Sequence, residues 1–278
     1  MRSAEAPTRD DVQGIRDYWI DGALARIRGN DPQHSLGKST RPYTTARVEH
    51  GRARWLEAHC ARLTRDSLAL GLPPPAPGAI RQGFETLARA VFGEGPGIVR
   101  MAAGEKSSGE SLLVAEARGL GPSSAAWRGG IAPFPHPGPG RHPGAKLSPV
   151  LEFEEARALC LKNELDELLF FDDRGRLVEG TRSSLIVIDG DGRARTPSPT
   201  LGGVESIALA KIDARKPLNL VADPDLRRSD LQGAREIIAL NAVRGATAIT
   251  QLEGRAVGTG QPGEGARALE RSLAAGES

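Results

Sequence analysis

The amino-acid sequence predicts a two-domain fold of mixed helices and strands, which we class as α+β (α/β two-domain). Its 278 residues suffice for one large domain or two modest ones. Short β-prone runs ending at Gly, Asp or Pro alternate with stretches of helical periodicity, as in sheets covered by helices. Residues 133–144 are too rich in Pro and Gly to form a regular element. We therefore expect a flexible tail at 1–14, a small N-terminal domain at 15–120 and a larger C-terminal domain at 121–278, with the Pro/Gly stretch as an early loop of the latter.

The elements of the first domain follow from local patterns. Two short strands are expected within 17–27, joined by an Asp-Gly turn. A β-prone strand at 43–48 precedes a helix at 56–70, which ends at a glycine followed by three prolines. The apolar face of that helix is expected to hold Leu56, His59, Leu63, Leu68 and Leu70. A second helix at 80–91 and paired strands at 98–101 and 111–117 complete the domain.

The second domain is expected to continue the mixture of helices and strands. A helix at 149–163 begins with a proline, which the first turn of a helix tolerates. An acidic turn at 172–175 joins strands at 168–171 and 176–179 into a hairpin. The remaining elements are a strand at 184–188, helices at 204–211 and 225–231, strands at 236–240 and 249–252, and a terminal helix at 264–275.

The composition argues against several classes of function. The 37 Lys and Arg residues nearly balance the 35 Asp and Glu residues, and aromatic residues make up only 4%. Neither charge nor base stacking therefore predicts nucleic-acid binding. Two cysteines without C-x-x-C spacing and five scattered histidines predict no disulfide framework and no metal site. The polar N-terminus and the lack of a long apolar run favour a cytoplasmic protein without membrane association.

Lys146 stands out because of the segments downstream of it in the chain. After the helix at 149–163 and the acidic hairpin comes the run L-V-E-G-T-R-S-S-L at 177–185. This order resembles the class IV aminotransferases, the fold-type IV enzymes of pyridoxal 5'-phosphate (PLP), which carry a lysine, a helix, an acidic hairpin and V-x-E-G-x-x-S-N. The resemblance implies that Lys146 holds the cofactor as a Schiff base and that Glu179 faces its pyridine nitrogen, roles that require an amine and a carboxylate. It also implies a small N-terminal α/β domain and a larger C-terminal pseudo-barrel domain.

The N-terminal half carries a second part of the resemblance. The runs T-T-A-R-V-E-H-G-R at 44–52 and L-E-A-H-C-A-R-L at 56–63 are similar to the family's F-E-T-L-R-V…G…L-E-x-H-x-x-R-L. By resemblance, Arg62 contacts the cofactor phosphate, which suits a guanidinium because it can donate two hydrogen bonds. Thr45 is implied to lie beside the cofactor, where it positions substrate or relays a proton. His59 is expected to pack at the helix rather than to act as a base.

Two further runs complete the implied cofactor site. T-P-S-P-T-L-G-G-V-E-S at 196–206 is similar to the family's T-P-P…L-P-G-[IV]-T-R, whose amides at a helix N-terminus bind phosphate. The resemblance assigns that role to the amides of Val204 and Glu205. The run E-I-I-A-L-N-A-V-R-G at 236–245 resembles the family's next strand and phosphate-side turn, which implies a cofactor contact at Ala242.

Three details favour one branch of the family. T-T-A-R-V, Asn241-Ala242 and Leu151 resemble 4-amino-4-deoxychorismate lyases, whereas branched-chain transaminases usually have F-E-G-[IL]-R, a hydroxyl at the position of Ala242 and a tyrosine at that of Leu151. We therefore expect a PLP-dependent lyase that converts 4-amino-4-deoxychorismate to 4-aminobenzoate and pyruvate in the folate pathway, with Lys146 as the base.

Two alternatives remain open. One is a branched-chain or D-amino acid transaminase. The other is an inactive paralogue with a binding role, suggested by Ser184, Glu205 and Ser206 in place of the family's usual asparagine, threonine and arginine. For partners, the resemblance implies a small-molecule substrate and a homodimer.

Overall fold

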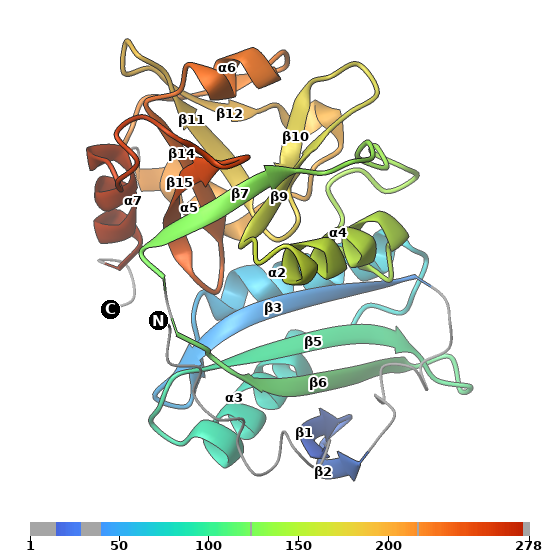
Figure 1. The fold of residues 1–278 in the computed structure, drawn as a ribbon. Coiled ribbons are helices and arrows are strands. Elements are labelled where there is room, and N and C mark those ends of the chain that lie inside the picture. Colours follow the sequence, from blue (N-terminus) through green and yellow to red (C-terminus); the bar gives the residue numbers. More distant parts are fainter. Residues whose placement is uncertain (1–14, 29–39, 123, 216, 275–278) are drawn as a thin grey trace. The chain divides into compact units, whose positions relative to one another are not determined.

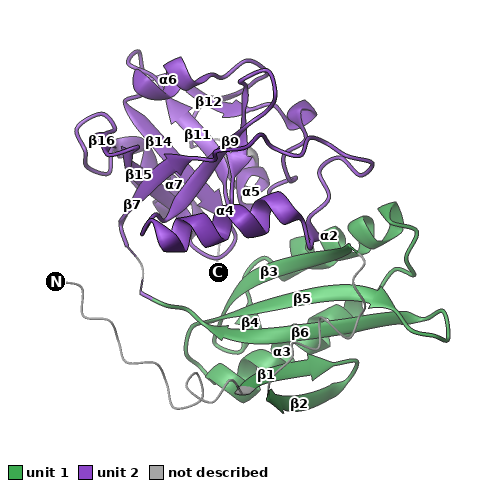
Figure 2. Ribbon diagram, turned by 45° about the vertical axis from the view of Figure 1, so that its right-hand side comes forward, with its two compact units in different colours: residues 1–121 green, residues 122–278 purple. Residues whose placement is uncertain are grey.

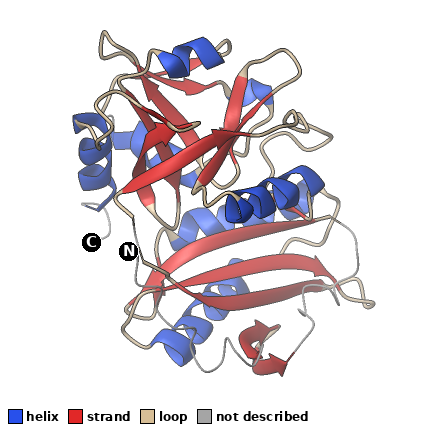
Figure 3. Ribbon diagram, in the orientation of Figure 1, coloured by secondary structure: helices blue, strands red, loops and turns tan. Residues whose placement is uncertain are grey.

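The computed structural model describes residues 15–28, 40–122, 124–215 and 217–274, and the tail expected at 1–14 lies outside them. The chain divides into two compact units, Met1–Gly121 and Pro122–Ser278 (Figure 2). Each unit combines helices with strands, which confirms the predicted α+β class (Figure 3).

The first unit is an antiparallel sheet with two helices on one face. Its strands are β1 (Ile15–Ile20), β2 (Ala23–Arg28), β3 (Arg41–Glu49), β4 (Arg52–Ala53), β5 (Gly97–Glu105) and β6 (Ser111–Gly119), and its helices are α2 (Leu56–Ala69) and α3 (Pro77–Phe92). The main order across the sheet is β2-β1-β6-β5-β3-β4. Leu63 of α2 and Phe84 of α3 belong to one buried cluster with Val48, Met101 and Ala115 of the strands, so hydrophobic burial holds both helices on the same face.

The second unit is built on one curled sheet. The strands of this sheet are β7 (Ala126–Ile131), β9 (Glu167–Phe171), β10 (Leu177–Gly180), β11 (Ser184–Ile188), β12 (Ala194–Pro197), β13 (Leu220–Asp223), β14 (Glu236–Asn241), β15 (Gly245–Leu252) and β16 (Arg255–Ala256). The unit also contains the two-residue strand β8 (Leu147–Ser148), which is not part of this sheet. The order across the sheet is β10-β9-β7-β15-β14-β11-β12-β13, with β16 paired to β15. Strand β7 lies between β9 and β15 and is parallel to both, although it is far from β15 in sequence (Figure 1).

Helices and loops cover the sheet of the second unit. The helices are α4 (Leu151–Lys162), α5 (Ile207–Arg215), α6 (Arg228–Gln232) and α7 (Glu264–Ala274), with a 3-10 turn, η2, at Pro199–Leu201. Helix α4 buries Ala156 and Cys160 against Leu168 and Phe170 of β9. The buried Glu236 carboxylate of β14 accepts hydrogen bonds from the amides of Gly265 and Ala266 and thereby caps the start of α7.

Some sequence-based expectations about helices need correction. The helix expected at 149–163 begins at Leu151, with Val150 as its N-cap, so Pro149 lies before the helix and not in its first turn. The buried side of α2 is rotated from the predicted face: Leu68 is exposed, whereas Arg62 and Asp66 are buried with Leu63. The helix expected at 204–211 begins later, at Ile207, because the Ser206 hydroxyl accepts a hydrogen bond from the Leu209 amide at 3.2 Å and caps the first turn. The strand β13 was not predicted, since only its two terminal residues are even half-buried and its pattern carries little hydrophobic signal.

Candidate active site

Lys146 lies in the second unit, between the Pro/Gly stretch and α4. It is half-buried, and the stretch before it contains neither helix nor strand, as predicted. That stretch is nevertheless fixed in place. Gly202 has a φ of +95°, and a Cβ there would lie 2.4 Å from the Pro139 nitrogen, so only glycine permits this close approach of the two loops.

Glu179 is a buried acid at the end of the hairpin predicted from the sequence. The turn is held by the Asp172 carboxylate, which accepts hydrogen bonds from the amides of Arg174 and Arg176. A shift in register between Leu177 and Glu179, where β10 pairs with β9, marks a bulge. Glu179 thus lies beside an irregularity of the ladder, a kind of feature that changes the direction of neighbouring side chains.

Both oxygens of the Glu179 carboxylate have partners. Oε1 lies 3.1 Å from Nε2 of His136, and Oε2 accepts a hydrogen bond from the Val204 amide at 3.2 Å. Glu179 is only 6% exposed and His136 only 7%. A Cβ at Gly203 would lie 3.6 Å from Cδ of Glu179, so the absence of that side chain leaves space beside the carboxylate.

The loop predicted to bind phosphate is tied to both segments. The Glu205 amide donates to the Gly144 carbonyl at 2.9 Å, two residues before Lys146, while the Val204 amide is engaged by Glu179. Both amides precede α5, so they do not form its first turn. The structure thus brings the segments of Lys146, Glu179, Val204 and Glu205 together, but in this arrangement the two amides already donate within the chain. Their role in phosphate binding stays a prediction.

Ala242 lies in the turn between β14 and β15. The Asn241 carbonyl oxygen, Oδ1, accepts hydrogen bonds from the amides of Val243 at 3.0 Å and Arg244 at 2.8 Å and so shapes the turn. The amide nitrogen of the same side chain donates to Ser183 Oγ at 3.3 Å. The turn that carries Ala242 is thereby attached to the loop that follows Glu179.

That loop rests on a buried acid that the sequence analysis did not identify. Glu167 accepts hydrogen bonds from the Thr181 hydroxyl, from the Arg182 amide at 3.1 Å and from the Ser183 hydroxyl at 2.6 Å. Burial raises the pKa of its carboxyl, an effect that the charge of Arg182 and these hydrogen bonds offset only in part. The hydroxyls of Thr181 and Ser183 in T-R-S-S were the available signal, because buried hydroxyls require partners.

Thr45 and Arg62 belong to the first unit. Thr44, Ala46 and Val48 of β3 are buried, whereas Thr45 lies on the opposite, half-buried face, where it is in register with Arg100 of β5. Arg62 is only 7% exposed. His59 is fully buried, with Nδ1 2.5 Å from the Thr44 hydroxyl, which agrees with packing at the helix. The contacts of Thr45 and Arg62 with a cofactor stay predictions.

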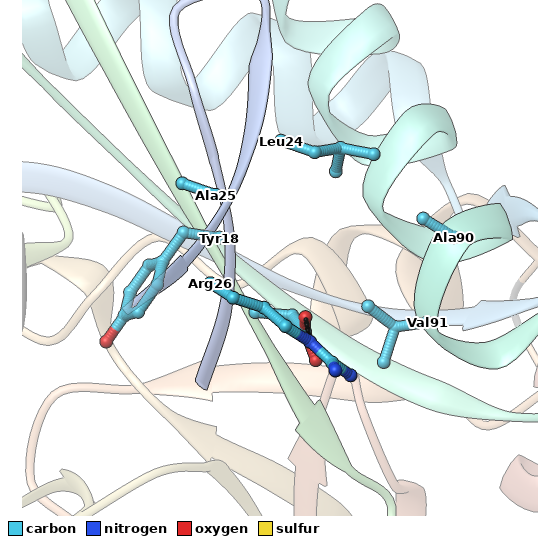
Figure 4. A pocket seen from close by; sticks show the side chains of 7 residues that line it. Tyr18, Leu24, Ala25, Arg26, Ala90 and Val91 are labelled. Atoms are coloured by element: carbon cyan, nitrogen blue, oxygen red, sulfur yellow. Dashed lines mark hydrogen bonds and ion pairs between the residues drawn. The ribbon is translucent and has the colours of Figure 1, made fainter. Parts of the chain in front are cut away.

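A pocket of about 370 Å³ in the first unit contains none of the predicted site residues (Figure 4). It is lined by Asp17, Tyr18, Leu24, Ala25, Arg26, Ala90 and Val91. Two of these residues, Asp17 and Arg26, form an ion pair at 2.7 Å, so the charged groups of the lining already pair with each other.

Two classes of feature were not found within the described parts of the chain. No group of three or more His, Cys, Asp or Glu side chains is arranged to hold a metal ion there. None of the helices in those parts is long and apolar enough to cross a membrane.

Comparison with known proteins identifies the family. The profile described as Amino-transferase class IV matches residues 42–252, about three quarters of the chain. The chain belongs to the class IV aminotransferase family. The protein is therefore a PLP-dependent enzyme. No curated protein matches its sequence.

Solved structures show the same fold. A branched-chain aminotransferase of Thermoproteus uzoniensis, solved with norvaline, has a TM-score of 0.81 at 18% identity, over 94% of each chain. That of Escherichia coli has a TM-score of 0.80 at 16% identity, over 95% of each chain. A branched-chain aminotransferase of Thermobaculum terrenum in its PLP form has a TM-score of 0.76 at 18% identity, over 94% of each chain.

The ring end of the candidate site fits PLP. Glu179 offers a buried carboxylate beside the space left by Gly203, and Lys146 remains the predicted source of the amine. A carboxylate has about four lone-pair positions, so the two donors that Glu179 already has leave capacity for the pyridine N–H. At the phosphate end, the exposed acid Glu205 stands where the family has threonine, and the match is weaker there.

Proposed function

We propose that the protein is a 4-amino-4-deoxychorismate lyase, with Lys146 as the cofactor-binding residue and proton acceptor. The main support is the buried Glu179 carboxylate and its link to the segment before Lys146. The carboxylate accepts a hydrogen bond from the Val204 amide, and the next amide, that of Glu205, donates to the Gly144 carbonyl. The choice of lyase over transaminase rests on T-T-A-R-V at 44–48 and on Asn241-Ala242. Leu151 adds no support from the structure, because its side chain is 72% exposed.

Each residue has a defined task in this proposal. PLP, when bound, supplies an electron sink that stabilises negative charge on the substrate carbon next to nitrogen. Nζ of Lys146 holds the cofactor and then takes the proton from that carbon. Glu179 faces the pyridine nitrogen and favours its protonated form. Arg62 holds the phosphate and Thr45 positions the substrate.

The reaction balances without a second substrate. Loss of the proton to Lys146 is followed by cleavage of the carbon–oxygen bond to the enolpyruvyl group, and the ring becomes aromatic. The leaving group takes up a proton and departs as pyruvate, so that 4-amino-4-deoxychorismate yields 4-aminobenzoate and pyruvate alone.

The transaminase alternative requires a different balance. A branched-chain or D-amino acid donor would leave its amino group on the enzyme, and a 2-oxo acid would have to accept it. The names of the structural neighbours suggest this reaction, but at 16–19% identity those neighbours indicate the fold alone.

The first test establishes the attachment site. Full-length protein is incubated with PLP, reduced with borohydride and digested, and the peptides are analysed by mass spectrometry. We expect the reduced cofactor on Lys146, and we expect Lys146→Ala to lose both the modified peptide and the absorbance band of bound PLP. Lys162→Ala at the exposed end of α4 is the matched control and should retain both. If the reduced cofactor is found on another lysine, or if Lys146→Ala keeps the absorbance band, the proposed role of Lys146 is wrong.

The second test separates the two reactions. Purified protein receives enzymatically generated 4-amino-4-deoxychorismate without any 2-oxo acid. Formation of 4-aminobenzoate and pyruvate in equal amounts supports the lyase. Bound PLP without either product, together with amino transfer from an amino acid to 2-oxoglutarate, would replace the lyase with a transaminase. Size-exclusion chromatography with light scattering tests the proposed homodimer.

A further inference from the structure

His136 of the Pro/Gly stretch is held rigidly within the second unit. Its backbone amide donates to the Phe171 carbonyl at 2.7 Å. Its ring meets the rings of Phe153 and Phe170 nearly at right angles, with centroids 5.6 and 5.8 Å away. Its side chain is 2% exposed. A polar ring buried among aromatic residues is costly unless its nitrogens are hydrogen-bonded, so their partners reveal its role.

The hydrogen bonds of His136 define which nitrogen carries the proton. The Gly138 amide donates to Nδ1 at 3.0 Å, so Nδ1 contributes a lone pair and the ring proton resides on Nε2. Gly138 adopts a φ of +81°, a conformation that L side chains rarely adopt, and this allows its amide to turn back toward the ring. Nε2 then donates to Oε1 of Glu179 at 3.1 Å.

We propose that His136 is a positioning residue for Glu179. Its Nε2–H holds one carboxylate oxygen while the Val204 amide holds the other, so the orientation of the carboxylate is set from two sides and its negative charge is stabilised. The donor is itself fixed by Gly138 and two aromatic rings. His136 touches no reacting atom and acts through Glu179. This inference rests on the proposed function, in which Glu179 faces the pyridine nitrogen.

The proposal is tested with two substitutions and a control. His136→Leu removes the donor and puts an apolar side chain of similar volume in its place, whereas His136→Gln can place an amide N–H near the position of Nε2. His142→Leu replaces a half-buried histidine of the same stretch that lies outside the proposed site. For each full-length protein, spectral titration gives the dissociation constant for PLP, and the holoenzyme gives the absorbance maximum of the bound cofactor.

We expect His136→Leu to weaken PLP binding by up to about tenfold, because a carboxylate that has lost one of its two donors must be reoriented when the pyridine N–H binds; the full worth of the lost hydrogen bond is the upper limit. The absorbance maximum of this variant should also shift, while His136→Gln and His142→Leu remain within a few-fold of the wild type at an unchanged wavelength. Thermal melting without PLP shows whether each variant is folded. If His136→Leu does not fold, the result for His136→Gln still decides. A dissociation constant for PLP and an absorbance maximum equal to those of the wild type would support donation to Glu179. A folded His136→Gln protein that binds PLP weakly would overturn the proposal.

Glu179→Gln separates the failure of this inference from failure of the proposed site. If Glu179→Gln alters PLP binding and the absorbance maximum but His136→Leu alters neither, His136 only fills space and the positioning role is wrong. If Glu179→Gln also has no effect while Lys146→Ala abolishes binding, Glu179 does not face the ring and the proposed arrangement of the site fails first.

Discussion

Replacing Glu167 by glutamine should change the pH dependence of stability in a defined direction. The carboxyl is fully buried, and desolvation raises its pKa above the ordinary value of 4.5 despite the charge of Arg182 and the donors around it. In the unfolded chain the group ionises near the ordinary value, whereas in the folded protein it resists ionisation. The wild type must therefore lose stability as the pH rises from about 4.5 through the raised pKa of the folded state.

The expected magnitude has a constant part and a pH-dependent part. In the wild type, the Thr181 and Ser183 hydroxyls donate to different oxygens of the Glu167 carboxylate. Glutamine has only one side-chain oxygen, so one of these hydrogen bonds is lost, which costs about 1 kcal/mol at every pH. Between the two pKa values, the wild type loses up to about 1.4 kcal/mol of stability per pH unit, while the variant has no such titration. Glu167→Gln should thus be the less stable protein at pH 4.5 and should gain on the wild type as the pH rises.

Urea denaturation of both proteins at several pH values between 4.5 and 8, at one protein concentration, measures this difference. All other groups titrate in both proteins, so their contributions cancel when the two curves are subtracted. A difference in unfolding free energy that stays constant over this range would refute the reasoning, because it would mean that Glu167 ionises equally easily in the folded and unfolded chains.

Three further outcomes follow from buried contacts. Gly180→Ala places a Cβ 2.9 Å from Cδ of the same buried acid and should lower the free energy of unfolding in urea by about 1–3 kcal/mol. An unchanged free energy of unfolding would mean that the end of β10 or the Glu167 side chain shifts to make room. Glu236→Ala removes the cap of α7 and should cost about 2 kcal/mol, or roughly 4–8 °C in Tm, while Glu270→Ala on the exposed side of that helix should melt like the wild type. Burial raises the thiol pKa of Cys60 and Cys160. Alkylation of these thiols by iodoacetamide at pH 8, followed by mass spectrometry, should therefore be on the order of tenfold slower in the native protein than in urea. Equal rates would contradict the burial of the two thiols.

Residues with a local sequence signature were readily placed. The acidic turn before Glu179 was predicted because Asp and Gly carry their turn preferences within four residues, and the structure has that hairpin. The wider resemblance indicated the family, which the profile match confirms. A short motif specifies residues that are neighbours along the chain, and in a hairpin turn those neighbours also determine the local backbone conformation.

The sequence analysis missed the residues whose role depends on partners far away along the chain. His136 meets Glu179 43 positions away, and Glu167 meets Ser183 16 positions away, so no window of local periodicity contains either pair. The face of α2 was misjudged for a related reason. Apolar periodicity locates leucines, but the unit also buries Arg62 and Asp66, whose polar groups give no hydrophobic signal.

The position of β7 has a consequence for synthesis of the chain. This strand is the first of its unit to leave the ribosome, yet one of its two neighbours, β15, spans Gly245–Leu252 near the other end. Until β15 emerges, β7 has an unpaired edge, and β14 has only β11 of its two partners. The sheet can therefore close only when nearly all of the unit has been made, and a nascent or truncated chain ending before Gly245 presents open strand edges to pairing with other chains.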